Sequence, residues 1–217
     1  MPQKNKVNCY TTSTKTTHSH RKSEVVGPCG PCPFINLVGI KGSFNLEKKL
    51  AQAGRLKPFH ISDYTSFLVW GEEFNKDFMV YTSSRKIPNK AFRLMQKYEG
   101  ISDDNFMQFK NKGLKQHDKI DKKFSFKIHI MKNPLLKLNL LLEKNYNVAV
   151  LTSAFYFDRE DPVPHWIVAY KKEGQNYLFK DSANGLISLT KSKLEKGWEI
   201  NKEQGFYPQF VAYKEKN

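Results

Sequence analysis

The chain has 217 residues, of which 39% are hydrophobic and 13% aromatic, so its length suits one domain with a substantial core. Its 36 Lys and Arg against 21 Asp and Glu give a formal net charge of +15, which favours acidic partners. No apolar run approaches the roughly 18 residues of a membrane span. No motif that reads DNA or RNA accompanies the lysines, and the N-terminus lacks the apolar core of a secretory signal.

The N-terminal part of the chain predicts an arm followed by helices. Residues 1–24 are rich in Thr, Ser, Lys and His, which predicts a disordered or loosely attached basic arm before a single domain over residues 25–217. Caps, turn residues and apolar spacing predict helices over residues 32–41, 45–54, 63–70, 89–98 and 135–144. The lysine-rich stretch from Lys110 to Lys127 is interpreted as a solvated, flexible connection.

The C-terminal part changes to the pattern of β-strands. Short β-branched and aromatic runs predict strands over residues 126–130, 148–157, 165–170, 176–180, 186–190 and 207–214. Gly174 marks the turn of a hairpin, and a short helix capped by Thr190 or Ser192 is expected through Trp198. Helices followed by strands predict an α+β fold, with an N-terminal helical part packed on a C-terminal antiparallel β-sheet.

The segment GPCGPCPFINLVGI, residues 27–40, combines two cysteines with the start of a predicted helix. A thiol at a helix N-terminus lies in the field of the helix dipole, which in general lowers its pKa and makes the thiolate available as a nucleophile. The unpaired N–H groups of the same helix can stabilise an oxyanion. Acyl chemistry at such a thiol also needs a general base, commonly a histidine that a third polar group orients.

His165 and Asp181 supply a candidate base and its partner. His165 begins the predicted strand HWIVAY, and Asp181 ends NYLFKD, the second strand of the hairpin. In an antiparallel hairpin the start of one strand lies beside the end of the other, so we expect the two residues to be neighbours. A carboxylate on one imidazole nitrogen fixes the tautomer and leaves the other nitrogen for the thiol. The pattern therefore predicts a Cys–His–Asp triad.

The order Cys, His, Asp, with the cysteine at a helix start and the other two on a later hairpin, resembles the papain-like cysteine peptidase superfamily. Within it, HWIVAY, YLFKDSANG and LEKGWE look most like the bacteriocin-leader (double-glycine) peptidase type, and GPCPFINL is similar to the catalytic helix of papain-like deubiquitinases with a Gly-Pro-Cys triplet. The specific matches are confined to residues 27–42 and 165–198. The resemblance implies a papain-like cysteine peptidase that cleaves a peptide or isopeptide bond, and deubiquitination, deamidation or transglutamination are alternatives on the same fold.

Gly-Pro-Cys occurs twice, so the nucleophile is Cys32 or Cys29. A helix that begins at Cys32 places Pro33 at the favoured first helical position. A helix that begins at Cys29 would place Pro33 where it removes an intrahelical hydrogen bond. Cys32 is the predicted nucleophile on this ground, whereas the Cys-Gly-Pro start of the double-glycine type matches Cys29.

The oxyanion would be held by the backbone N–H of Cys32 and by a second donor that the sequence does not identify. The families that the chain resembles usually have a Gln six positions before the nucleophile. This chain has Val26 there for Cys32 and Ser23 for Cys29. Val26 has no side-chain donor and Ser23 has one. The absence of the Gln therefore leaves open both the second oxyanion donor and the choice between Cys32 and Cys29.

The two cysteines also allow other functions. Cys29-Gly-Pro-Cys32 is identical to the dithiol motif of thioredoxin-like oxidoreductases, but that fold requires apolar strands upstream, where this chain is mostly polar. Zinc ligation by Cys9, His18, His20, Cys29 and Cys32 is disfavoured, because the two histidines are too close together for a usual zinc finger. A non-catalytic basic binding module is a further alternative.

No metal or organic cofactor is expected, and the expected partner is a protein or peptide substrate of acidic character. A specific nucleic acid is not expected, and the pattern does not indicate an oligomeric state. Three cysteines make no disulfide framework. With no secretory signal, the prediction is a reducing, cytoplasmic location or export by a signal-independent route.

Overall fold

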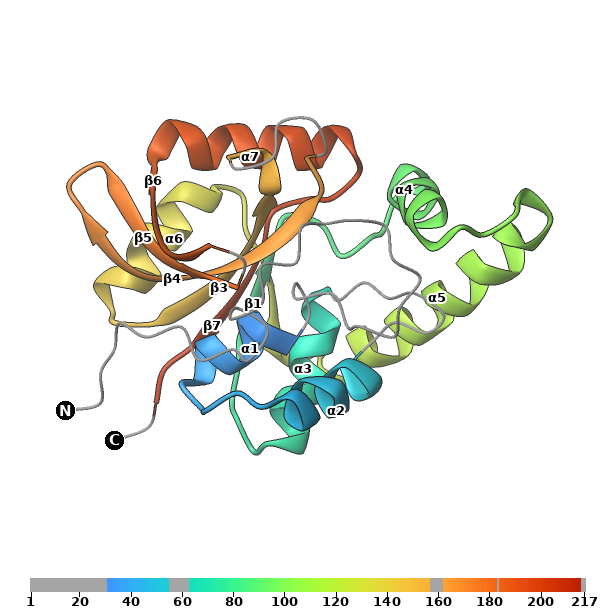
Figure 1. Cartoon of the computed structure of the whole chain (residues 1–217), viewed down its shortest axis with the longest axis horizontal. Helices are drawn as coiled ribbons and strands as arrows, with labels where there is room; N and C mark the ends of the chain where they lie inside the picture. The colour runs from blue at the N-terminus through green and yellow to red at the C-terminus, as the bar shows by residue number, and fades with distance from the viewer. Residues whose placement is uncertain (1–30, 55–62, 157–161, 183, 216–217) are drawn as a thin grey trace.

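The computed structural model describes residues 31–54, 63–156, 162–182 and 184–215. Over these residues seven α-helices cover a seven-stranded mixed sheet with the order β2-β1-β7-β3-β4-β5-β6 (Figure 1). Six of the helices precede strands β3 to β7 along the chain, which confirms the predicted α+β class. The predicted arm, residues 1–24, lies outside the described residues.

Most of the predicted elements are present, with ends that differ by a few residues. The helices are α1 (Pro31–Val38), α2 (Phe44–Gly54), α3 (Tyr64–Glu73), α4 (Asn89–Glu99), α5 (Asp103–Lys123), α6 (Pro134–Glu143) and α7 (Lys191–Glu203). The strands are β1 (Met79–Thr82), β2 (Ile128–Ile130), β3 (Asn147–Ser153), β4 (Pro164–Glu173), β5 (Asn176–Asp181), β6 (Gly185–Thr190) and β7 (Gln209–Tyr213). Two short 3-10 helices, η2 (Ser125–Lys127) and η3 (Ala154–Tyr156), occupy parts of predicted strands.

The sheet is antiparallel except at one edge, where β1 and β2 pair in parallel. Parallel strands need a long crossover, and α4 and α5 provide it between β1 and β2. β1 was not predicted because its four residues, MVYT, are too short a run among helices to show a strand period. The predicted antiparallel sheet is therefore present from β1 through β7, β3, β4 and β5 to β6, and only the β1–β2 pair departs from it among the described strands.

The two faces of the sheet are buried by different helices. Ala149 and Leu151 of β3 pack in a core with residues of α1 to α5. Val148 and Val150 of the same strand pack in a second core with residues of α6 and α7. Figure 1 shows α7 on one side of the sheet and α1 to α3 on the other. Because side chains alternate along a strand, a residue's position in the register gives the face on which it lies.

Helix α1 is enclosed by the molecule. All eight of its residues are buried, and the helix lies against β3, β4 and β5. Its C-terminal end is fixed at the start of β3, where the Asn147 side-chain amide donates a hydrogen bond of 3.3 Å to the carbonyl of Leu37. The N-terminal end of α1 is therefore directed toward β4 and β5.

The lysine-rich stretch that was interpreted as a flexible connection is a helix. Residues 103–123 form α5, whose buried positions recur every three to four residues at Phe106, Phe109, Gly113, His117 and Asp121. Asp103 and Asp104 lie in the first turn and Lys122 and Lys123 in the last, an arrangement that complements the helix dipole. The lysines of this helix lie on its solvent face, which agrees with a solvated stretch, and the prediction of a flexible connection is wrong.

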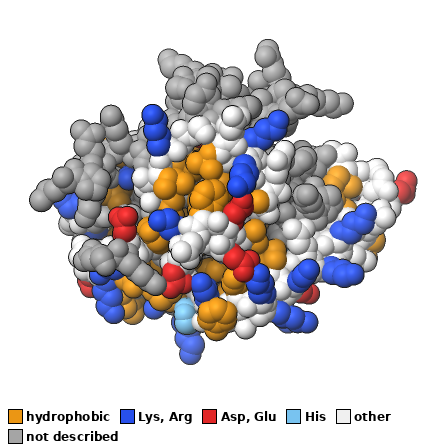
Figure 2. Space-filling view, turned by 90° about the horizontal axis from the view of Figure 1, so that it is seen from below, with side chains coloured by type: hydrophobic (Ala, Val, Ile, Leu, Met, Phe, Trp, Pro, Cys, Tyr) orange, Lys and Arg blue, Asp and Glu red, His pale blue; other side chains and the backbone are white. Residues whose placement is uncertain are grey.

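Charge is dispersed on the face seen in Figure 2, where Lys and Arg side chains surround a central group of apolar side chains and are interspersed with Asp and Glu. Within the described ranges no helix combines the length and the apolarity needed to cross a bilayer.

Candidate functional site

His165 and Asp181 are in contact at the ends of two neighbouring strands. The His165 Nε2 atom lies 3.1 Å from Asp181 Oδ1, and the two side chains are 1% and 0% exposed. This confirms the prediction that the two residues are neighbours. In this dry setting the hydrogen bond fixes the ring orientation and makes Nδ1 the ring nitrogen that a nucleophile would use.

Two further groups hold the other carboxylate oxygen of Asp181. The Tyr156 hydroxyl, from η3, donates a short hydrogen bond to Asp181 Oδ2, and the Asn184 side-chain amide donates one of 3.2 Å. The Tyr156 and His165 rings are 6.5 Å apart between centroids. Neither residue was predicted for this site. No local pattern marks Tyr156 as a partner of Asp181.

The strand register explains why His165 and Asp181 are in contact. His165 pairs with Thr152 of β3, and Ile167 and Ala169, which lie on the same face of β4, belong to the core under α6 and α7. Asp181 follows Tyr177 and Phe179 of that same core at intervals of two along β5. Both side chains therefore point toward the face that α6 and α7 cover.

Cys32 lies on the other face. Its side chain is 1% exposed and packs in the core of α1 to α5, together with Trp166 and Val168 of β4. Cys32 is disulfide-bonded, and its partner lies outside the described residues. The Cys32 and His165 side chains therefore lie on opposite faces of the sheet, and no contact between them is found among the described residues.

The remaining candidates of the N-terminal segment lie outside the described residues. They are Cys29, the alternative nucleophile, the oxyanion positions Ser23 and Val26, and the zinc candidates Cys9, His18 and His20. Among the residues that are described, no cluster of three His, Cys, Asp or Glu side chains could hold a metal ion.

A second buried polar cluster lies around the start of α3 and was not predicted from the sequence. Asp63 caps α3 and lies 3.5 Å from Nε2 of His117, and the two side chains are 12% and 2% exposed. The Tyr64 hydroxyl donates a hydrogen bond of 2.7 Å to Asp121 Oδ1, and Arg85 Nε donates one of 2.9 Å to Asp121 Oδ2. These contacts join α3, α5 and the segment after β1, so they fasten helices to the sheet.

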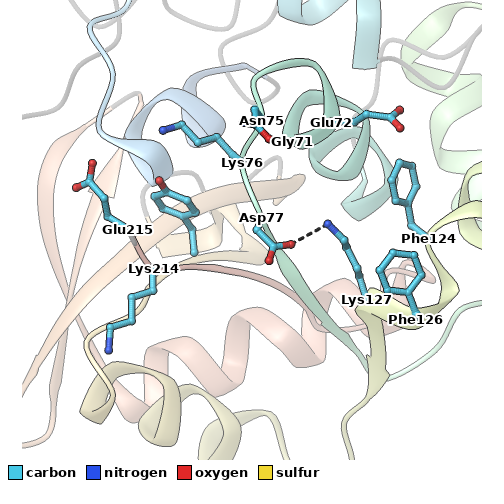
Figure 3. A pocket seen from close by; sticks show the side chains of 11 residues that line it. Gly71, Glu72, Asn75, Lys76, Asp77, Phe124, Phe126, Lys127, Lys214 and Glu215 are labelled. Atoms are coloured by element: carbon cyan, nitrogen blue, oxygen red, sulfur yellow. Dashed lines mark hydrogen bonds and ion pairs between the residues drawn. The ribbon is translucent and has the colours of Figure 1, made fainter. Parts of the chain in front are cut away.

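A pocket of about 660 Å³ opens at the far end of the sheet from His165. Tyr213, in its lining, pairs with Asn147 at the start of β3, whereas His165 pairs with Thr152 near the end of that strand. Figure 3 shows Phe124 and Phe126 on one side and Lys76, Lys214 and Glu215 on the other. Three lysines face three carboxylates in the lining, so the pocket favours no ligand of one charge.

The sequence matches no family model and no curated protein.

Proposed function

We propose that the chain is a cysteine hydrolase in which a thiol at the start of α1 attacks a peptide or isopeptide carbonyl, His165 is the general base, and Asp181 orients His165. The observation that carries this proposal is the buried 3.1 Å contact between His165 Nε2 and Asp181 Oδ1. It lies on the two strands toward which the cysteine-bearing end of α1 is directed. A buried imidazole held by a carboxylate is the arrangement that nucleophilic thiol catalysis requires.

The proposed chemistry follows from which ring nitrogen Asp181 occupies. Because Nε2 faces Asp181, Nδ1 of His165 takes the thiol proton as sulfur adds to the carbonyl carbon. The oxyanion collapses, the C–N bond breaks, and the imidazolium gives its proton to the leaving amine. Water then loses a proton to the neutral ring, attacks the thioester, and releases the acid and the thiol. An amine in place of that water would give acyl transfer.

The nucleophile comes from the Cys29–Cys32 pair. The position of Cys32 in α1 favours it as the nucleophile. Three observations count against it: the side chain is buried, it is disulfide-bonded, and it lies on the face opposite His165. Cys29, three residues earlier in the chain, is the second Gly-Pro-Cys thiol. Catalysis through either sulfur requires the reduced form, since only a thiolate is a nucleophile.

Covalent labelling of the reduced full chain tests the proposal. The probes are ubiquitin and a short peptide, each with an electrophilic group at the C-terminus, and mass spectrometry locates the adduct. We expect an adduct on one of the two cysteines, loss of that adduct on Cys→Ser change at the same position, and at least about tenfold slower labelling in His165→Ala. Equal labelling of both cysteines that His165→Ala leaves unchanged would overturn the proposal.

A thiol–disulfide oxidoreductase is the second candidate function, and the disulfide at Cys32 is the observation that favours it. This alternative predicts that reduction of an insulin-type disulfide requires both Cys29 and Cys32 and proceeds unchanged in His165→Ala. The hydrolase requires His165 and one cysteine. The same set of variants therefore separates the two functions.

A further inference from the structure

Strand β6 is the last strand of the sheet on the side of the candidate site, and its outer edge is open. β5 pairs with its inner edge in antiparallel register, and the backbone N–H of Lys191 continues this ladder with a hydrogen bond of 3.2 Å to the carbonyl of Gln175. In an antiparallel ladder every second residue bonds to the partner strand, so the odd-numbered residues of β6 bond to β5. Leu186 and Ser188 therefore direct their backbone N–H and C=O groups outward. Within the described part of the chain no strand pairs with these groups.

The composition of β6 leaves this edge unprotected. Its six residues, GLISLT, include no charged residue and no proline. Leu186 is 50% exposed, and Ser188 and Thr190 are exposed beside it. Natural sheets usually block an open edge with charges, with proline, with a bulge or by keeping the strand very short, as in β2 with its three residues. The edge of β6 is therefore suited to pairing with an extended chain.

The open edge leads to the candidate site. Gly185, the first residue of β6, pairs with Asp181, and His165 of β4 contacts Asp181 at the same end of the sheet. A chain that pairs antiparallel with β6 runs toward this end, so its C-terminal side emerges beside the site. Neighbouring strands are about 4.8 Å apart, so the added chain would lie roughly 14 Å from β4, a distance that about four or five extended residues span.

The charges around β6 favour an acidic peptide over a second copy of the chain. Lys191 and Lys193 follow β6 and are exposed at the far end of the edge. Glu195 lies 4.0 Å from Lys191, and no carboxylate pairs with Lys193 in the described ranges. Two copies of a chain with a formal net charge of +15 repel each other, which opposes the pairing of β6 with β6. Acidic side chains on a peptide would instead be attracted to this end of the edge.

We propose that β6 binds an extended acidic segment of the substrate as an additional antiparallel strand, N-terminal to the scissile bond. This inference rests on the proposed hydrolase function. The backbone groups of Leu186 and Ser188 hydrogen-bond to the backbone of the segment, and the exposed Leu186 side chain packs against an apolar residue of the added strand. Because main-chain groups make these bonds, the segment is recognised by its extended form and its charge and not by one particular sequence.

Solvent exchange of single backbone amides tests the binding without any cleavage. The reduced, full-length protein is titrated with a heptapeptide of alternating Glu and Val, blocked at both ends, and exchange is followed by NMR. We expect exchange at Leu186 and Ser188 to slow at least about threefold at saturating peptide, because both N–H groups become hydrogen-bonded. The same peptide with Lys in place of Glu is the charge control and should bind at least about threefold more weakly.

Ser188→Pro tests whether the backbone of the edge makes the contact. The proline removes an N–H that points outward, so it should leave the ladder with β5 intact, whereas Ser188→Ala keeps that N–H and is the matched control. Each reduced protein is labelled with two electrophilic peptide probes, only one of which carries the Glu and Val segment about five residues before the electrophile. We expect the segment to speed labelling at least about tenfold in the unchanged protein and in Ser188→Ala, and at most about twofold in Ser188→Pro.

The outcomes separate the inference from the hydrolase function. Protection of Leu186 and Ser188 in a protein that neither probe labels would support strand binding and count against the hydrolase. Unchanged exchange at both amides, or protection of β2 in their place, would overturn the inference whether or not a cysteine is labelled. Equal gains from the segment in Ser188→Pro and Ser188→Ala would also overturn it. A dimer that protects the same amides without peptide, and that Ser188→Pro abolishes, would show that a second copy occupies the edge and would overturn it as well.

Discussion

Asp181 receives hydrogen bonds from three parts of the chain, and this makes it the organising residue of the site. His165 contacts one carboxylate oxygen, and Tyr156 and Asn184 donate to the other. Several hydrogen bonds to one buried carboxylate fix the orientation of its side chain. Tyr156 donates to the carboxylate that contacts His165, so it acts as a positioning residue.

Tyr156→Phe tests this positioning role. The change removes one donor from Asp181 and leaves the ring in place, so the protein should remain folded. Without this donor the carboxylate holds the His165 ring less firmly in place, and we expect about three- to tenfold slower labelling by the peptide probe. The slower labelling should persist under conditions in which both proteins are fully folded, so that it reports positioning and not stability.

Two results would contradict that role. If the labelling rate of Tyr156→Phe equals that of the unchanged protein once both are fully folded, but falls where the variant is partly unfolded, Tyr156 acts only through stability. If the two rates match under every condition, the hydroxyl does not position Asp181. Tyr207→Phe is a suitable control, because Tyr207 is half-buried and the described residues offer it no hydrogen bond.

How far the sequence predicts single residues depends on whether their partners are local. The His165–Asp181 contact could be predicted because a hairpin brings strand ends together, whatever the rest of the fold does. Tyr156 could not, since it reaches Asp181 from η3, 25 positions away, and no periodicity marks it. The face occupied by Cys32 also depends on the packing of α1 against the sheet, which no motif contains.

Helices and strands were predictable where the apolar period agreed with local turn signals. α5 was not predicted, because the lysine-rich stretch was interpreted from its charge, although its buried residues recur with a helical period. β1 is four residues long, and its strand state comes from pairing with β7 on one side and β2 on the other. For the shortest strands, pairing with neighbouring strands therefore decides the secondary structure more than local propensity does.

Gly197→Ala tests how α7 is seated on the sheet beside the site. A Cβ at Gly197 would lie 2.3 Å from Thr152 Oγ1 and 3.3 Å from the Ser153 backbone nitrogen. Alanine favours a helix by about 1 kcal/mol over glycine, but overpacking of a core costs about 1–3 kcal/mol. We expect a net loss of up to about 2 kcal/mol in the free energy of unfolding, measured with urea.

Thr152 is the residue that pairs with His165, so the clash should also reach the site. Gly197→Ala combined with Thr152→Ala removes the contact atom and should regain much of the lost stability. Lys196→Ala, one position earlier on the exposed side of α7, is the control and should change stability by no more than about 0.5 kcal/mol. A stability gain in Gly197→Ala alone would show that α7 is not held against Thr152.

The whole molecule is held together by two cores and by a buried polar cluster at the start of α3. The cores lie on opposite faces of the sheet, and the cluster links α3, α5 and the segment after β1 through Asp121. Asp121 accepts from both Tyr64 and Arg85, so its charge is matched inside the protein. Helix α1 itself packs against α2 and against β3, β4 and β5.

The pH dependence of global stability should report this cluster through Tyr64. Burial, and then the charges of Asp63 and Asp121, raise the pKa of the Tyr64 hydroxyl well above its usual value. The folded protein therefore keeps the phenol protonated where the unfolded chain, with a tyrosine pKa of about 10, loses the proton. The stabilisation is fully present below about pH 10 and is lost as pH rises toward the folded-state pKa, by up to about 1.4 kcal/mol per pH unit.

Tyr64→Phe removes this dependence together with the hydrogen bond to Asp121. At pH 8 we expect the variant to be about 1–3 kcal/mol less stable in urea unfolding, since a bond to a buried carboxylate is lost. Between pH 10 and 11 the unchanged protein should lose stability faster than the variant, so the two curves should converge. The lysines titrate in this range in both proteins and cancel in the difference. Parallel curves would show that the Tyr64 hydroxyl is not what ties α3 to α5.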